Sequence, residues 1–175
     1  GGGGGVLILA SSDIAGSVTF LEEGSGTDER IWVTVHSTHG PHLVCCWYRP
    51  PDESNSDEFN RFEEEYLRLR AGTMGAMILG DLNLHNVKWP DHSSHTSPAG
   101  RRMEGLAKAV GLQQLVKEPT REGNLLDLVL SDIKGASASV HAPIADHSLV
   151  LGCLDLQVPE EEIITRKVWC FDQAD

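Results

Sequence analysis

A short apolar run that leads directly into a polar loop constrains this chain more than any other stretch. Residues 76–79 read AMIL between two glycines, and residues 80–89 read GDLNLHNVKW. Four apolar residues are too few for a helix, so they predict a buried strand that ends in a loop. If the backbone stays extended past Leu82, Asp81 and Asn83 project to the same side, while Leu82 and Leu84 return to the core.

A carboxylate beside a carboxamide at the end of a buried strand has two interpretations. Together, Asp81 and Asn83 suit a hard cation and the phosphate or water that this cation holds. The alternative is an Asx-rich loop, in which these side chains cap their own backbone. This stretch alone leaves both interpretations open.

Composition restricts the class of protein. A length of 175 residues predicts one domain. A formal charge of -12 argues against binding nucleic acid through a broad basic surface, but it does not exclude a metal-dependent nuclease. The four cysteines form no CxxC pair, so we expect buried, reduced thiols in an intracellular protein. No apolar stretch is long enough to span a bilayer and no signal peptide is visible, so no membrane association is expected.

The remaining sequence predicts strands and helices in one mixed fold. Helices are expected at about 57–70, capped by Asn55 or Ser56, and at about 99–110, stopped by Gly111. Strands are expected at about 6–10, 17–22, 30–36, 43–48, 112–116 and 125–130, and after residue 147. The opening glycines lack the following Lys-Ser/Thr of a phosphate loop, so that interpretation is dismissed.

Two acidic residues in the last third of the chain are candidates for a role in catalysis or metal binding. Asp127 interrupts the apolar run LLDLVL, where a carboxylate is costly unless it is paired. It is either a structural hydrogen-bond acceptor or an acid that orients a catalytic histidine. Further on, HAPIADH (141–147) brings Asp146 and His147 together, and neighbouring side chains reach one site only from a bend. Pro143 interrupts regular pairing, so we predict a bend before the final strand.

Four segments in this order resemble one family. YRPP from Tyr48, GDLNLHNVKW, PTREGNLLDLVL and IADHSLV are similar to the endonuclease/exonuclease/phosphatase superfamily, in the branch found at the start of non-LTR (LINE-type) retrotransposon polyproteins. The resemblance implies an α/β fold, a four-layer α/β sandwich of two packed β-sheets flanked by helices, incomplete at the amino-terminal side. It also implies an endonuclease domain over residues 1–158 and a linker over 159–175 toward a reverse transcriptase-like region.

The resemblance assigns roles to seven residues. Asp81 would position or activate the attacking water and contact the metal, with Asn83 as its partner around phosphate. Asp127 would orient His147, which serves as phosphate ligand or proton-transfer partner, and Asp146 would bind the metal. Tyr48 and Thr120 would contact the substrate. The implied cofactor is Mg²⁺, with Mn²⁺ as an alternative. The implied partners are DNA and the reverse transcriptase region of the same polyprotein, in the nucleus if the domain is active.

Two departures from the family pattern keep other functions open. Family members carry an upstream asparagine and a metal-binding glutamate, and by this resemblance we expect the given sequence to begin downstream of both. Ala145 replaces the serine that usually precedes the Asp-His pair. The alternatives are therefore a non-catalytic remnant of the same domain and a small-molecule or lipid phosphoesterase of the superfamily.

Overall fold

The computed structural model describes residues 5–24, 28–51, 57–88 and 92–159. The proposed caps Asn55 and Ser56, Trp89 of the central loop, and the linker after residue 159 lie outside these residues. The helices are η1 (Ala15–Ser17, a 3-10 turn), α1 (Asp57–Arg70) and α2 (Pro98–Val110). The strands are β1 (Val18–Glu23), β2 (Glu29–Ser37), β3 (Gly40–Tyr48), β4 (Ala76–Asp81), β5 (Gln113–Gln114), β6 (Asp127–Ser131), β7 (Ser137–Pro143) and β8 (Ser148–Cys153).

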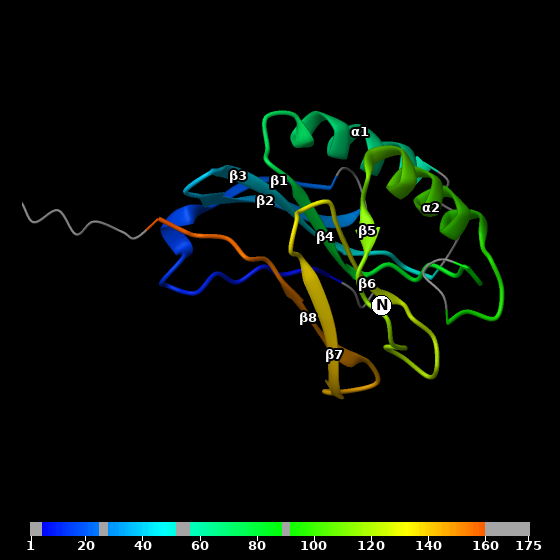
Figure 1. Cartoon of the computed structure of the whole chain (residues 1–175). Helices are drawn as coiled ribbons and strands as arrows, with labels where there is room; N and C mark the ends of the chain where they lie inside the picture. Colours follow the sequence, from blue (N-terminus) through cyan, green and yellow to red (C-terminus); the bar gives the residue numbers. More distant parts are fainter. Residues whose placement is uncertain (1–4, 25–27, 52–56, 89–91, 160–175) are drawn as a thin grey trace, which may run out of the picture.

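The strands form one large sheet and one hairpin. The large sheet has six strands in the order β1-β2-β3-β4-β6-β5, and β7 and β8 form a separate two-stranded sheet (Figure 1). Strands β3 and β4 are parallel, and the other paired neighbours are antiparallel. The carboxyl ends of β3 and β4 therefore lie at the same edge of the sheet, next to the start of β6. This edge carries the predicted site.

Helices α1 and α2 lie side by side over one face of the large sheet (Figure 1). The apolar stripe predicted for α1 is buried at Phe59, Phe62 and Tyr66, because three-to-four spacing places these side chains on one helix face. Phe62 stacks on Trp32 and Trp47, with ring centroids 5.7 and 4.4 Å apart. This aromatic cluster holds α1 on the sheet.

Helix α2 begins and ends where its sequence signals indicate. The Ser97 hydroxyl accepts a hydrogen bond from the Gly100 N–H at 3.0 Å, which satisfies one of the unpaired donors of the first turn. Gly111 ends the helix in the left-handed conformation that glycine adopts without strain.

The hairpin β7–β8 packs on the opposite face of the large sheet. Its inward-facing residues, including Val140 and Val150, pack against the apolar core, and a Cβ on Gly152 would lie 3.4 Å from Met77 and Val129. The described chain thus has a helix layer, a six-stranded sheet and a second sheet (Figure 1). The predicted fold class, an α/β sandwich of two packed sheets with helices outside, is confirmed.

Several expected strands differ from the structure. Residues 6–10 form no strand, and Leu7 and Leu9 are 73% and 82% exposed. An apolar run becomes a strand only when a neighbouring strand takes up its backbone hydrogen bonds, and no such pairing involves these residues in the described chain. The strand expected at 112–116 shortens to β5, and β7 was not foreseen because its sequence, SASVHAP, is small and polar. No helix in the described residues is long and apolar enough to cross a membrane.

Candidate active site

The site begins where β4 ends. At Gly80 (φ +142°), a Cβ would lie 2.0 Å from the Trp47 carbonyl oxygen, so only glycine lets β4 approach β3 this closely. Beyond it, Leu82 and Leu84 are fully buried, as the alternation predicted. Asp81 is therefore the last residue of a strand fixed on both sides, and its side chain stands at the rim of the sheet.

The loop after Asp81 bends at Asn83 instead of remaining extended. Asn83 has a φ of 45°, in the left-handed region that asparagine tolerates. Its backbone N–H donates to the Asp81 Oδ1 at 3.3 Å, and its side-chain amide donates to the Arg49 carbonyl at 2.7 Å. The local capping expected of an Asx-rich loop is thus present, and it sets the direction of the Asp81 carboxylate. The backbone does not stay extended as expected, but the Asn83 side chain still reaches the Asp81 carboxyl group, where its hydrogen bond acts to lower the pKa of Asp81. The role of the two side chains around a bound phosphate stays a prediction.

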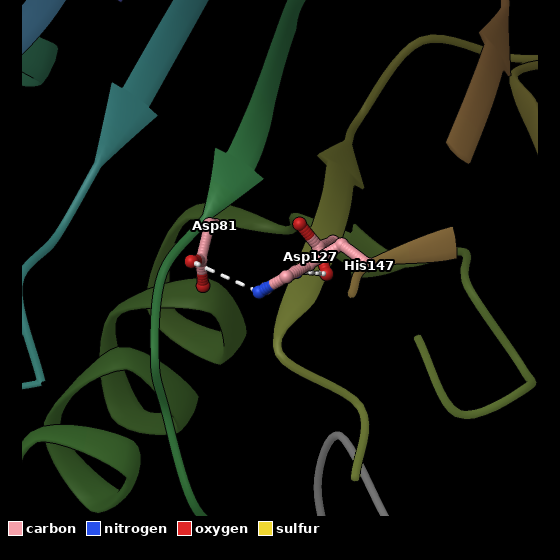
Figure 2. A group of neighbouring side chains, drawn as sticks. All are labelled: Asp81, Asp127 and His147. Carbon is pink, nitrogen blue, oxygen red and sulfur yellow. Dashed lines mark hydrogen bonds and ion pairs between the residues drawn. The ribbon is translucent and has the colours of Figure 1, made fainter. Parts of the chain in front are cut away.

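Two carboxylates and one imidazole meet at this rim (Figure 2). Asp127, the first residue of β6, has its Oδ2 2.8 Å from the His147 Nδ1, and the His147 Nε2 lies 3.9 Å from the Asp81 Oδ2. One donor atom from each of the three residues lies within 4.8 Å of the others. Asp127 and Asp81 thus lie on opposite sides of the imidazole.

Burial makes the Asp81 carboxylate costly to ionise. Desolvation, followed by the negative charge of Asp127, raises the pKa of Asp81 above its usual value, although His147 opposes the shift. Two nearby carboxylates beside an imidazole offer oxygen and nitrogen ligands that suit a divalent cation, whose charge would relieve their repulsion. The residues present therefore fit a cation held at Asp81.

Thr120 is hydrogen-bonded to the two segments that carry Asp127 and His147. It is 2% exposed, and its hydroxyl accepts hydrogen bonds from the Leu126 and Asp127 N–H groups, both at 3.1 Å. Its carbonyl accepts the Ser148 N–H at 2.8 Å, directly after His147. One buried residue therefore positions both Asp127 and His147, and the predicted substrate contact of Thr120 stays a prediction.

The structure does not bring every predicted residue into the cluster. The bend expected before the last strand is present as the loop of the β7–β8 hairpin, and it sends Asp146 and His147 in different directions. The Asp146 Oδ2 pairs with the Arg121 Nη2 at 3.0 Å, and the Asp146 side chain is 64% exposed. Tyr48 ends β3 half-buried, one residue before Arg49. The metal role of Asp146 and the substrate role of Tyr48 stay predictions.

Sequence reasoning missed two arginines that contact predicted site residues. Arg49 is buried against Asn83 and Arg121 is paired with Asp146. Both lie in quoted motifs, YRPP and PTREGN, and an arginine flanked by candidate site residues was the available signal. A cavity of about 320 Å³ opens between the sheets and is bordered by Asp127 and His147.

The fold and this acidic, histidine-containing rim define a domain of the endonuclease/exonuclease/phosphatase type. A family model described as endonuclease-reverse transcriptase matches residues 42–151, and the chain belongs to that family. The resemblance seen in the sequence is confirmed.

Solved structures agree on the fold. The endonuclease domain of TRAS1, a telomere-specific non-LTR retrotransposon, matches with a TM-score of 0.66 at 15% identity, over 80% of this chain and 69% of that domain. The human nocturnin catalytic domain with bound sulfate matches with a TM-score of 0.51 at 14% identity, over 79% of this chain and 60% of that one. At such identities the likeness shows the fold alone. No curated protein matches the sequence significantly.

Proposed function

We propose that this chain is the endonuclease module of a non-LTR retrotransposon polyprotein, which hydrolyses a phosphodiester bond of DNA with a divalent cation. The observation that carries the proposal is the convergence of Asp81, Asp127 and His147 at one sheet rim in a member of this family. The TRAS1 endonuclease domain and nocturnin with its bound sulfate share the fold. The polyprotein context predicts a reverse transcriptase region as covalent partner.

We assign each residue a step that this geometry supports. Asp127 accepts a hydrogen bond from the His147 Nδ1 and so fixes the tautomer that leaves Nε2 directed toward Asp81. From that position Nε2 can hold or deliver a proton to a phosphate oxygen placed between the two side chains. The Asp81 carboxylate orients the attacking water. When bound, Mg²⁺ (or Mn²⁺) would polarise the phosphoryl oxygen and offset its charge, with Asp81 and the proposed ligand Asp146 holding it.

Plasmid nicking tests this function. Supercoiled DNA is incubated with Mg²⁺ and either the chain or a form extended upstream by its own coding sequence, and open-circle product is measured. We expect Asp81→Ala and His147→Ala to lose at least about 100-fold in rate, because each removes a group that acts in the transition state. His36→Ala, an exposed histidine on β2, is the matched control and should nick normally.

The alternatives give different results in the same assay. A non-catalytic remnant would show no Mg²⁺-dependent product in either form of the protein. A small-molecule phosphoesterase would leave DNA intact and release phosphate from simple phosphomonoesters. Nicking that survives both substitutions would contradict the assigned roles.

A further inference from the structure

Arg49 is a charged residue in an unusual place. It follows the last residue of β3, is 2% exposed, and lies between α1 and the loop after β4. Its Nε is 3.3 Å from the Glu58 Oε2, and its guanidinium lies 5.4 Å from the centre of the Phe59 ring. Its Nη1 reaches the Asn83 carbonyl oxygen at 3.4 Å. The side chain thus joins the helix layer to the loop that follows Asp81.

The backbone of Arg49 holds the same loop from a second side. Its N–H donates to the Asp81 carbonyl at 2.8 Å, and its carbonyl accepts the side-chain amide of Asn83 at 2.7 Å. Residue 49 therefore contacts both ends of the Asp81–Asn83 bend, through two backbone groups and one side chain. A displacement of this residue moves the bend that directs the Asp81 carboxylate.

Stability alone does not explain a guanidinium here. A buried ion pair is often replaceable by apolar side chains of similar volume without loss of stability. Both members are buried, and Glu58 also accepts a hydrogen bond from the Trp47 Nε1 at 3.1 Å. Burial raises the pKa of Glu58 even though Arg49 opposes the shift, so the pair is placed at a cost. The branched guanidinium is the group that can reach Glu58 and Asn83 at once.

We propose that Arg49, supported by Glu58, is a positioning residue for the reaction: it locks the Asp81–Asn83 bend onto helix α1 so that Asp81 faces His147. This inference rests on the proposed function for its kinetic consequence. Its structural part, the fixing of Asn83 by the Arg49 side chain, is independent of it. An error of about 1 Å in placing a reacting group is enough to cost on the order of 100-fold in rate.

The chain provides a matched control in Arg30. This arginine is also fully buried, pairs with a glutamate of α1 (Glu65, 3.0 Å) and lies against an aromatic ring of the same cluster. Its second ion-pair partner is Asp28, on the β1–β2 side of the sheet, away from the loop after β4. Arg30→Met therefore removes a comparable buried ion pair without touching the bend.

The experiment compares Arg49→Met, Arg49→Lys and Arg30→Met in the nicking assay, with the side-chain amide of Asn83 followed by NMR. We expect both methionine variants to be less stable. Only the Arg49 variants should lose turnover, about 10-fold or more in kcat with KM for DNA nearly unchanged, and only they should shift the Asn83 amide signal. Arg49→Lys keeps the buried charge, so it should fold even if Arg49→Met does not. It should still lose turnover, because an ammonium group lacks the branched geometry with which the guanidinium contacts Glu58 and Asn83 together.

The outcomes separate the two proposals. If the unmodified protein never nicks DNA, the proposed function fails, and the Asn83 amide signal alone decides whether Arg49 fixes the bend. If the protein nicks and Arg49→Lys keeps full turnover with an unchanged Asn83 signal, the positioning role is overturned. An equal loss of kcat in Arg30→Met would also overturn it, because the effect would then be one of general stability.

Discussion

Replacing Thr120 by valine is the sharpest test of how the site is built. Valine has the shape of threonine, so the change removes the hydroxyl and leaves the volume. That hydroxyl accepts the Leu126 and Asp127 N–H groups at 3.1 Å within a residue only 2% exposed. Thr120→Val therefore removes the acceptor of one buried donor, the Leu126 N–H, and of one half-buried donor, the Asp127 N–H.

The expected cost follows from that count. The buried Leu126 donor costs about 1–3 kcal/mol when unsatisfied and the half-buried Asp127 donor about 1 kcal/mol, so the change costs roughly 2–4 kcal/mol, less a small gain from burying the extra methyl group. For a domain of this size, 1 kcal/mol corresponds to about 2–4 °C in Tm, so Tm should fall by roughly 4–16 °C. Thr120→Ser keeps the acceptor and loses one methyl group, so it should cost only about 0.5–1.5 kcal/mol.

Urea unfolding followed by tryptophan fluorescence measures the effect, because Trp32 and Trp47 are fully buried and change environment on unfolding. The His147 ring nitrogen signals should also move in Thr120→Val, since Thr120 anchors both Asp127 and Ser148. A Thr120→Val protein whose free energy of unfolding lies within about 0.5 kcal/mol of the unmodified value, the range of harmless surface changes, would refute this reasoning.

Two further predictions concern the same rim. Gly80→Ala should lower the free energy of unfolding by about 2–4 kcal/mol in denaturant titrations, because its Cβ would meet the Trp47 carbonyl oxygen at 2.0 Å. The control Gly105→Ala, with open space around it in α2, should raise the free energy of unfolding by about 0.5–1 kcal/mol. Burial and Asp127 raise the pKa of Asp81, so its stabilising contribution is complete below the usual value of 3.8 and is lost as pH rises through the folded-state pKa. Asp81→Asn should therefore unfold at higher urea than the unmodified protein at pH 7 in EDTA, and this advantage should vanish near pH 3; an advantage that grows on acidification would contradict the assigned shift.

Local sequence signals predicted the elements whose structure depends on local forces. Helix α1 runs from Asp57 to Arg70, as its apolar spacing indicated, and α2 begins one residue before its predicted start. Leu82 and Leu84 are buried as the sequence pattern predicted, although the strand ends at Asp81. The meeting of Asp81, Asp127 and His147 was predicted from family resemblance, since nothing local relates three segments so far apart in sequence.

The sequence-based predictions fail for segments whose structure depends on contacts with residues distant in sequence. The apolar run at residues 6–10 looks like a strand but pairs with no neighbour in the described chain. The loop bends at Asn83, which has a positive φ and whose side-chain amide donates to the carbonyl of Arg49, a residue distant in sequence. Arg49 and Glu58 were missed because charged residues read as exposed in sequence patterns, and their burial depends on each other.

The imidazole of the site belongs to the hairpin β7–β8, whereas both carboxylates belong to the large sheet (Figure 2). Neither sheet carries the chemistry by itself, so the distance between Asp81 and His147 reflects how the two sheets dock. Substitutions of apolar residues at their interface, such as Met77 and Val150, can therefore change the distance between Asp81 and His147 while Asp81, Asp127 and His147 themselves stay the same. Two related domains with identical motifs can therefore differ in the geometry of this site because their sheets pack differently.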